Sequence, residues 1–261
     1  MVHGQMSGIV SPLCRCSSLQ LIKLLKLTQL IKLIKLTKLI KLPQLTMTWI
    51  LVPAKASTDA KSRLAPVLSE EARSVLARLL LARLLTIIEQ EAPEATVLVV
   101  SDDAGLQAIA RLFGQRATAD PPARRRHADA LLNAVLDHGR EIARQSGARA
   151  LLVLPTDLPW LAPPTFAALW RRCQAVERGV VVAPDHHGAG TNALFQRPLD
   201  AIPFAFGPRS AQRHAEAARH AALPLHWWHG HALAHDLDQP SDWQRWLRNR
   251  NAEQVTRNET G

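Results

Sequence analysis

The amino-acid sequence predicts a three-layer α/β domain in which helices cover both faces of a mostly parallel β-sheet. Within residues 47–261, short runs rich in Val, Leu and Ile alternate with longer segments whose apolar residues have helical spacing. The run at 150–154 is apolar throughout, as expected of a central parallel strand covered on both faces. This alternation is typical of a parallel sheet, whose ligands bind beyond the carboxyl ends of the strands.

Local signals predict the individual strands and helices. Apolar runs predict strands at 49–52, 96–100, 150–154 and 180–183, and a further strand directly before Asp236. Ser69 is a favourable N-cap for the first long helix, and the two glutamates that follow it suit a helix N-terminus. Later helices are expected at 103–113, near 127–142, from Pro164 to about 176, and from Ser210 onward.

Residues 1–46 differ from the rest of the chain. Leu recurs at every third position from Leu21 to Leu45, a period that matches neither an α-helix nor a strand. We interpret this segment as low-complexity sequence that is disordered or lies upstream of the native start, with Met47 as a natural initiator. The alternative is a basic membrane-surface or targeting peptide. We expect residues 47–261 to form a single functional domain.

The charge of the chain is concentrated in that first segment. The formal net charge is +10, of which residues 1–46 carry +7 and residues 47–261 only +3. A nucleic-acid-binding protein is expected to be basic on its folded domain. The composition therefore argues against nucleic acid as a partner.

Other features of the composition favour a cytoplasmic protein. The three cysteines, Cys14, Cys16 and Cys173, form no disulfide framework, which suits a reducing compartment. The sequence contains neither a run of 18 uncharged apolar residues nor a secretory signal. We therefore expect no association with membranes.

A basic loop follows the first expected strand. It contains Lys55, Lys61 and Arg63, and three cations in one loop suit the binding of a triphosphate, whose charge must be neutralised before a nucleophile approaches. The loop is not a Walker P-loop, because the required glycine and lysine spacing is absent. The simpler alternative is a solvated basic loop.

Three aspartates stand at the expected ends of strands. Asp157 follows the run at 150–154 between two prolines, and Asp236 and Asp238 follow a later strand. Mg²⁺ prefers one or two carboxylates together with phosphate oxygens and water. We therefore predict a metal site formed by Asp157 and one of the other two, although turns and helix caps use the same residues. The sequence leaves the choice between Asp236 and Asp238 open.

Two glycine-containing loops, at 183–194 and 204–210, supply groups for an anion. Thr191 and Ser210 offer hydroxyls, and Gly207 allows the backbone to approach a ligand closely. Ser210 opens an expected helix, where free N–H groups favour an anion. Ordinary turns are the alternative interpretation.

Four histidines near the C-terminus, His226, His229, His231 and His235, could suggest zinc. They have no nearby cysteine or patterned glutamate. We interpret them as part of a surface strand and loop.

Together these segments resemble the CofC-type guanylyltransferases of coenzyme F(420) biosynthesis. The matching stretches, in order, are VPAK, AKSRLAPVLS, LPTDLPWL, APDHHGAGTNALF, FAFGPRSAQRH and HDLDQPSDW. The resemblance implies a MobA-like nucleotidyltransferase fold and a Mg²⁺-dependent transfer of GMP from GTP, with release of pyrophosphate. The acceptor would be a three-carbon phospho-acid: 2-phospho-L-lactate, phosphoenolpyruvate or 3-phospho-D-glycerate. A downstream transferase that uses the guanosine-diphosphate-linked acid would be the functional partner.

The resemblance also implies roles for individual residues. Asp157 and one of Asp236 or Asp238 match metal ligands. The acceptor's phosphate and carboxylate would be held by Thr191, Gly207 and Ser210, and the triphosphate by Lys55, Lys61 and Arg63. Asn133 would bind the nucleotide, but Leu131 stands where the family often has Gly.

Two other functions remain open on the sequence. One is a related nucleotidyltransferase with another base or acceptor, such as a molybdopterin or sugar-phosphate type. The other is a non-catalytic nucleotide-binding regulator, although such a protein could lose the metal carboxylates that this chain retains. The sequence leaves open the identity of the phospho-acid and whether the protein is a homo-oligomer. We expect His186, His187 and Arg209 to lie near the acceptor.

Overall fold

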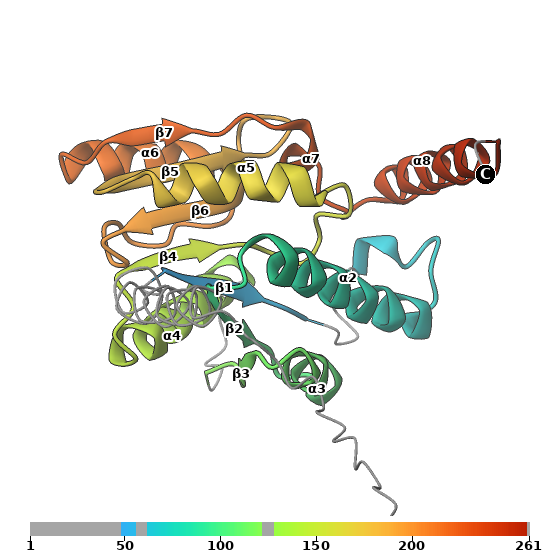
Figure 1. Ribbon diagram of the computed structural model, residues 1–261, viewed down its shortest axis with the longest axis horizontal. Coiled ribbons are helices and arrows are strands. Elements are labelled where there is room, and N and C mark those ends of the chain that lie inside the picture. Colours follow the sequence, from blue (N-terminus) through green and yellow to red (C-terminus); the bar gives the residue numbers. More distant parts are fainter. Residues whose placement is uncertain (1–47, 56–61, 122–127, 260–261) are drawn as a thin grey trace, which may run out of the picture. The chain divides into compact units, whose positions relative to one another are not determined.

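A computed structural model describes residues 48–55, 62–121 and 128–259 (Figure 1). Three parts of the sequence interpretation lie outside these residues. They are the low-complexity segment 1–46, the initiator candidate Met47, and Lys61 of the basic loop.

In the described part of the chain, seven strands form one sheet in the order β3-β2-β1-β4-β6-β5-β7. Their bounds are Thr48–Pro53 (β1), Thr96–Val100 (β2), Arg116–Thr118 (β3), Ala150–Val153 (β4), Gly179–Pro184 (β5), Thr191–Arg197 (β6) and Leu225–Trp227 (β7). Only β6 runs antiparallel to its neighbours, β4 and β5, among the pairs in this sheet. The prediction of a mostly parallel sheet is confirmed.

The described helices alternate with these strands. Their bounds are Ser62–Leu64 (η1, a 3-10 turn), Glu70–Glu91 (α2), Ala104–Leu112 (α3), Ala128–Gln145 (α4), Pro163–Gln174 (α5), Ser210–His220 (α6), His231–Ala234 (α7) and Pro240–Glu259 (α8). The Ser69 hydroxyl accepts a hydrogen bond from the backbone N–H of Ala72 at 3.2 Å, which confirms the predicted N-cap of α2. Proline opens α5, as expected from its preference for the first helical turn.

The two faces of the sheet carry separate hydrophobic clusters, because successive side chains of a strand point to opposite faces. Ile50 and Val52 of β1 pack with residues of α2, α3 and α5. Trp49 and Leu51 of the same strand pack with residues of α4 and α6. Helices therefore cover both faces, as the three-layer prediction required (Figure 1).

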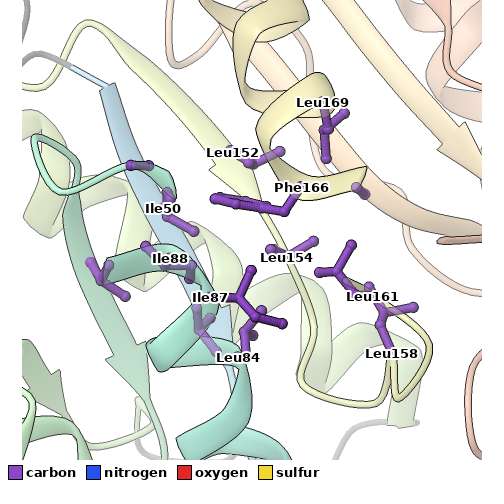
Figure 2. Packing of buried hydrophobic residues seen from close by; sticks show 14 of the residues in the cluster. Ile50, Leu84, Ile87, Ile88, Leu152, Leu154, Leu158, Leu161, Phe166 and Leu169 are labelled. Carbon is purple, nitrogen blue, oxygen red and sulfur yellow. The ribbon is translucent and has the colours of Figure 1, made fainter. Parts of the chain in front are cut away.

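The cluster on the α2 and α5 face anchors the loop that follows β4. Leu158 and Leu161 of this loop are 3% and 0% exposed and pack with Leu154 and Phe166 (Figure 2). Burial of two leucine side chains stabilises the loop by roughly 3–6 kcal/mol. Asp157, directly before Leu158, is thereby carried on a fixed segment.

Two segments differ from the sequence prediction. Residues 191–194, which we assigned to a glycine-containing loop, belong to β6, whose Phe195 and Leu194 pack on opposite faces of the sheet. The expected strand before Asp236 is wrong, because the short helix α7 stands there and buries Leu233 completely. No helix in the described residues is sufficiently long and apolar to span a membrane.

Candidate active site

The candidate site lies where β1 and β4 end and β6 begins. Lys55 follows β1, Asp157 follows β4, and Thr191 is the first residue of β6. Because β1 and β4 are parallel and β6 is antiparallel to β4, these positions share one edge of the sheet. The register also places Thr191 opposite Pro184, the last residue of β5. The antiparallel strand thus brings its N-terminus to the edge where ligands of α/β sheets bind.

Asp157 and Asp236 lie close together at this edge. The backbone N–H of Leu237 donates a hydrogen bond to the carbonyl oxygen of Asp157 at 2.8 Å, which ties the segment after α7 to the loop after β4. The pKa of Asp236 is raised to about 6. Burial is the largest cause, and the negative charge of Asp157 is the second. Two neighbouring carboxylates are a suitable donor set for a divalent cation.

Asp238 has a different partner. Its carboxylate forms an ion pair with the guanidinium of Arg63 on η1. Its backbone N–H and that of Gln239 donate to the Asp242 carboxylate at 3.3 and 2.8 Å, which caps the start of α8. The sequence left the choice between Asp236 and Asp238 open. The charge of Asp157 raises the pKa of Asp236, which places these two carboxylates side by side. Asp238 also lies near enough to raise the pKa of Asp236.

The predicted triphosphate cations have different surroundings. Lys55 is exposed and lies near Asp120, whose pKa is raised by burial and by Asp102 and lowered by the Lys55 charge. The side chain of Arg63 is 65% exposed and is directed to Asp238. We assigned no role to Asp120 or Asp102 from the sequence. Their proximity to Lys55 depends on the β1-β2-β3 pairing, which local sequence does not reveal.

The loop between β5 and β6 is fixed by its own hydrogen bonds. The Asp185 carboxylate accepts from the N–H of Ala189 at 2.9 Å, and the Asp185 N–H donates to the carbonyl of Gly190 at 3.1 Å. A Cβ at Gly190 would lie 2.7 Å from the Asp185 carboxylate, so a larger residue here would displace that side chain from its hydrogen bond with Ala189. The N–H of Ala211 donates to the carbonyl of Ala189 at 3.0 Å and joins this loop to the first turn of α6.

The loop before α6 is held by Asn133. The side-chain oxygen of Asn133 accepts from the backbone N–H of Phe206 at 2.9 Å. Its side-chain NH₂ donates to the backbone carbonyl of Phe206 at 3.1 Å and to that of Asp129 at 2.9 Å. The polar atoms of this side chain are therefore used to fix the backbone next to Gly207. We predicted Asn133 to bind the nucleotide, which stays a prediction; in the structure its side chain holds the backbone at Phe206.

Gly207 and Ser210 occupy special backbone positions in this loop. Gly207 has a φ of +118°, and a Cβ there would lie 2.6 Å from the Asp129 carboxylate. Arg209 adopts the left-handed conformation with a φ of 57° immediately before α6 begins. Ser210 is the first residue of α6 and is 1% exposed. Two N–H groups of this first turn are already used, because that of Ser210 donates to the carbonyl of Gly207 at 3.1 Å and that of Ala211 to the carbonyl of Ala189 at 3.0 Å. The positive end of the helix dipole still favours an anion here.

Thr191 is hydrogen-bonded to a residue that the sequence analysis overlooked. The Nδ1 atom of His214, on α6, lies 3.1 Å from the hydroxyl oxygen of Thr191. The Nε2 atom accepts from the N–H of Ala205 at 3.0 Å. His214 is completely buried. Its position four residues after Ser210, on the face of α6 shared with Ala211 and Ala218, is a signal that could have identified it.

The four histidines near the C-terminus do not gather into one group. His226 contacts the Arg172 side chain at 2.8 Å, and the ring of His229 stacks against Trp227. His231 and His235 instead lie beside each other, and His235 also stacks on His186. Within the described residues, no group of three or more His, Cys, Asp or Glu side chains has a geometry suited to a metal ion.

The site thus combines a pair of carboxylates, a helix N-terminus with adjacent hydroxyls, and a basic residue at one edge of an α/β sheet. This combination is chemically suited to phosphate groups and a divalent cation. The fold and the site define a nucleotidyltransferase. Residues 48–252 match the family described as "Guanylyl transferase CofC like", and the chain belongs to that family.

Two relatives in sequence are also named as guanylyltransferases. The chain is 37% identical over 195 residues to a phosphoenolpyruvate guanylyltransferase of Sphaerobacter thermophilus, covering 75% of this chain and 90% of that protein. It is 39% identical over 197 residues to a phosphoenolpyruvate guanylyltransferase of Rubrobacter xylanophilus, covering 75% and 91%. The prediction of a guanylyltransferase-type enzyme is confirmed.

Solved structures share the fold at much lower identity. A CMP:2-keto-3-deoxy-manno-octonic acid synthetase complexed with CTP matches with a TM-score of 0.52 at 14% identity, covering 80% of this chain and 100% of that one. A 4-diphosphocytidyl-2C-methyl-D-erythritol synthase matches with a TM-score of 0.51 at 16% identity, covering 77% and 98%. These similarities confirm the predicted fold.

Proposed function

We propose that this chain transfers GMP from GTP to a three-carbon phospho-acid, with release of pyrophosphate, as a step in coenzyme F(420) biosynthesis. Phosphoenolpyruvate is the first candidate for the acceptor, because the relatives at 37% and 39% identity are named for it. The observation that carries the proposal is the proximity of Asp236 and Asp157 at the edge of the sheet where Thr191 and the start of α6 also lie.

A divalent cation fits the carboxylate pair. Asp157 and Asp236 would hold Mg²⁺, which takes one or two carboxylates and completes its coordination with phosphate oxygens and water. When bound, the cation would neutralise negative charge on the reacting phosphates. The mutual repulsion of the two carboxylates, which contributes to the raised pKa of Asp236, is the feature that a cation would relieve.

The remaining groups bind and orient the two substrates. Lys55 and Lys61, together with Arg63 held by Asp238, would neutralise the triphosphate of GTP. Thr191, Ser210 and the backbone at Gly207 would bind the phosphate and carboxylate of the acceptor. Asn133 would fix the backbone at Phe206 and so keep Gly207 in place.

The reaction needs no covalent enzyme intermediate. A phosphate oxygen of the acceptor would attack the α-phosphorus of GTP in line, a new phosphorus–oxygen bond would form, and the bond to the leaving pyrophosphate would break. The acceptor phosphate is already an anionic nucleophile, so we assign no general base. The contribution of the protein is position and charge neutralisation.

The surroundings of the reaction follow from this function. We propose that the protein acts in the cytoplasm, where GTP is available, and that a downstream transferase consumes the guanosine-diphosphate-linked acid. We also propose that residues 47–261 contain the complete catalytic domain.

The test is pyrophosphate release by the full chain with GTP and Mg²⁺. Phosphoenolpyruvate, 2-phospho-L-lactate and 3-phospho-D-glycerate are supplied separately, with a sugar phosphate as the acceptor control and ATP and CTP as nucleotide controls. Release that requires GTP and one of the three acids supports the proposal and identifies the acceptor. Release that instead requires a sugar phosphate, or another nucleotide, would contradict it.

A further inference from the structure

His214 joins two segments of the candidate site. Its Nδ1 lies 3.1 Å from the hydroxyl oxygen of Thr191 at the start of β6, and its Nε2 accepts from the N–H of Ala205 at 3.0 Å in the loop before α6. The Phe206 ring packs at 68° to the imidazole with a centroid separation of 5.0 Å. One buried side chain therefore sets the position of Thr191 relative to the loop that contains Gly207.

The backbone contact fixes which nitrogen carries the proton. A backbone N–H can only donate, so Nε2 must be the unprotonated nitrogen. A neutral imidazole carries one N–H, which is then on Nδ1 and donates to Thr191. Burial lowers the pKa of His214 to about 4, with a smaller effect of the Arg213 charge, so the ring is neutral near pH 7.

This arrangement also fixes the Thr191 hydroxyl. Its oxygen already accepts from the His214 Nδ1–H, so its own hydrogen cannot point toward that nitrogen. The hydrogen is left for another acceptor atom. A phosphate or carboxylate oxygen is such an atom, and a hydrogen bond to a charged group is about twice as strong as one between neutral groups.

We propose that His214 is a positioning residue that orients the Thr191 hydroxyl as a hydrogen-bond donor to the anionic acceptor. This inference rests on the proposed function, because that function assigns Thr191 to the acceptor. His214 itself does not touch the substrates, and it acts through the Thr191 hydroxyl and through the backbone at Ala205.

The tautomer of His214 is a direct test that does not depend on activity. Full-length protein labelled with ¹⁵N-histidine is studied by long-range ¹H–¹⁵N correlation NMR at pH 7, and the His214 signals are assigned by their loss in His214→Gln. The proposal requires the proton on Nδ1. A proton on Nε2, or on both nitrogens, would overturn it whatever the enzyme catalyses.

Matched substitutions separate the two contacts of the ring. In His214→Gln the side-chain carbonyl can replace Nε2 and accept from Ala205, but the donor to Thr191 is lost. In His214→Asn the amide can replace Nδ1 and donate to Thr191, but the Ala205 contact is lost. Thr191→Val removes the hydroxyl while keeping the shape of the side chain.

The kinetic readout is the KM of the acceptor compared with the KM of GTP. Loss of one hydrogen bond to a charged group is worth about tenfold in affinity. We expect Thr191→Val and His214→Gln each to raise the acceptor KM about tenfold, with the GTP KM unchanged. The double variant should be no worse than Thr191→Val alone, and His214→Asn should lose less than His214→Gln.

The outcomes distinguish this inference from the proposed function. If Thr191→Val raises the acceptor KM and folded His214→Gln does not, the positioning role is overturned and the proposed function stands. Multiplicative effects in the double variant would overturn it as well, because the two residues would then act independently. If the wild-type protein transfers GMP but Thr191→Val changes nothing, the assignment of Thr191 to the acceptor fails, and this inference fails with it.

Discussion

The backbone N–H of Leu237 donates a hydrogen bond to the carbonyl oxygen of Asp157 at 2.8 Å. This bond joins the loop after the central strand β4 to the segment between α7 and α8. It brings the Asp236 side chain to the side of Asp157, where burial and the neighbouring charge raise its pKa to about 6. Two carboxylates separated by 79 positions in the sequence thereby form one candidate metal site.

The three aspartates should differ in their effect on turnover. We expect Asp157→Asn and Asp236→Asn each to lower kcat about a thousandfold, because charge stabilisation by a bound metal is worth several kcal/mol. Asp238→Asn should lower it less than about tenfold, since it removes an exposed ion pair with Arg63. Steady-state kinetics measure the effect, and circular dichroism checks folding. Near wild-type turnover in Asp157→Asn would rule out its metal role.

His214 should make the stability of the protein depend on pH. Its pKa is lowered from 6.5 to about 4 in the folded protein, so between these values the unfolded chain binds more protons than the folded one. The contribution of His214 to the free energy of unfolding is fully present above pH 6.5 and is lost toward pH 4, by up to about 3 kcal/mol. Urea unfolding at pH 7.5, 5.5 and 4.5 measures this loss. His214→Gln is the control, and an equally steep loss in that variant would assign the effect to other groups.

Gly207 should tolerate no side chain. In Gly207→Ala the new Cβ would meet the Asp129 carboxylate at 2.6 Å, and the φ of +118° disfavours any other residue. We expect the acceptor KM to rise about tenfold or more, because the loop must move. Gly114→Ala is the matched control, since its φ is +68° but nothing lies within 4 Å of the added Cβ. A wild-type acceptor KM in Gly207→Ala would show that this backbone does not contact the acceptor.

Removal of residues 1–46 should leave catalysis intact. These residues carry +7 of the +10 formal charge, so any affinity for a polyanion should disappear with them. The kcat and both KM values of the 47–261 fragment are compared with those of the full chain, and binding to DNA is measured in parallel. Loss of activity in a folded fragment would show that the first segment belongs to the catalytic unit.

Local sequence was sufficient to predict most of the fold. The apolar run of β4 and the cap at Ser69 are local signals, and the structure contains both elements. The direction of β6 is not a local property, because it depends on pairing with β4 and β5 on either side. Residues 193–195 form a short apolar run in the sequence, but the glycines before Thr191 suggested a loop.

The site was predictable in its members more than in its contacts. Asp157 was identified because it follows a strand, and Thr191 because it offers a hydroxyl in a glycine-containing loop. The structure places both at the same edge of the sheet. The preference for Asp236 over Asp238 depends on α7 and on Arg63, which lies 175 positions from Asp238. The function of His214 depends on Ala205 and Thr191 meeting one imidazole, and no pattern of spacing predicts that contact.

The most direct test of guanylyl transfer is ³¹P NMR of a reaction containing the full chain, GTP, Mg²⁺ and phosphoenolpyruvate. We expect free pyrophosphate together with two mutually coupled phosphorus signals of equal intensity, from a diphosphate that joins guanosine to the acid. Pyrophosphate accompanied only by GMP would show hydrolysis instead of transfer. That result, obtained with each of the three phospho-acids, would contradict the central claim.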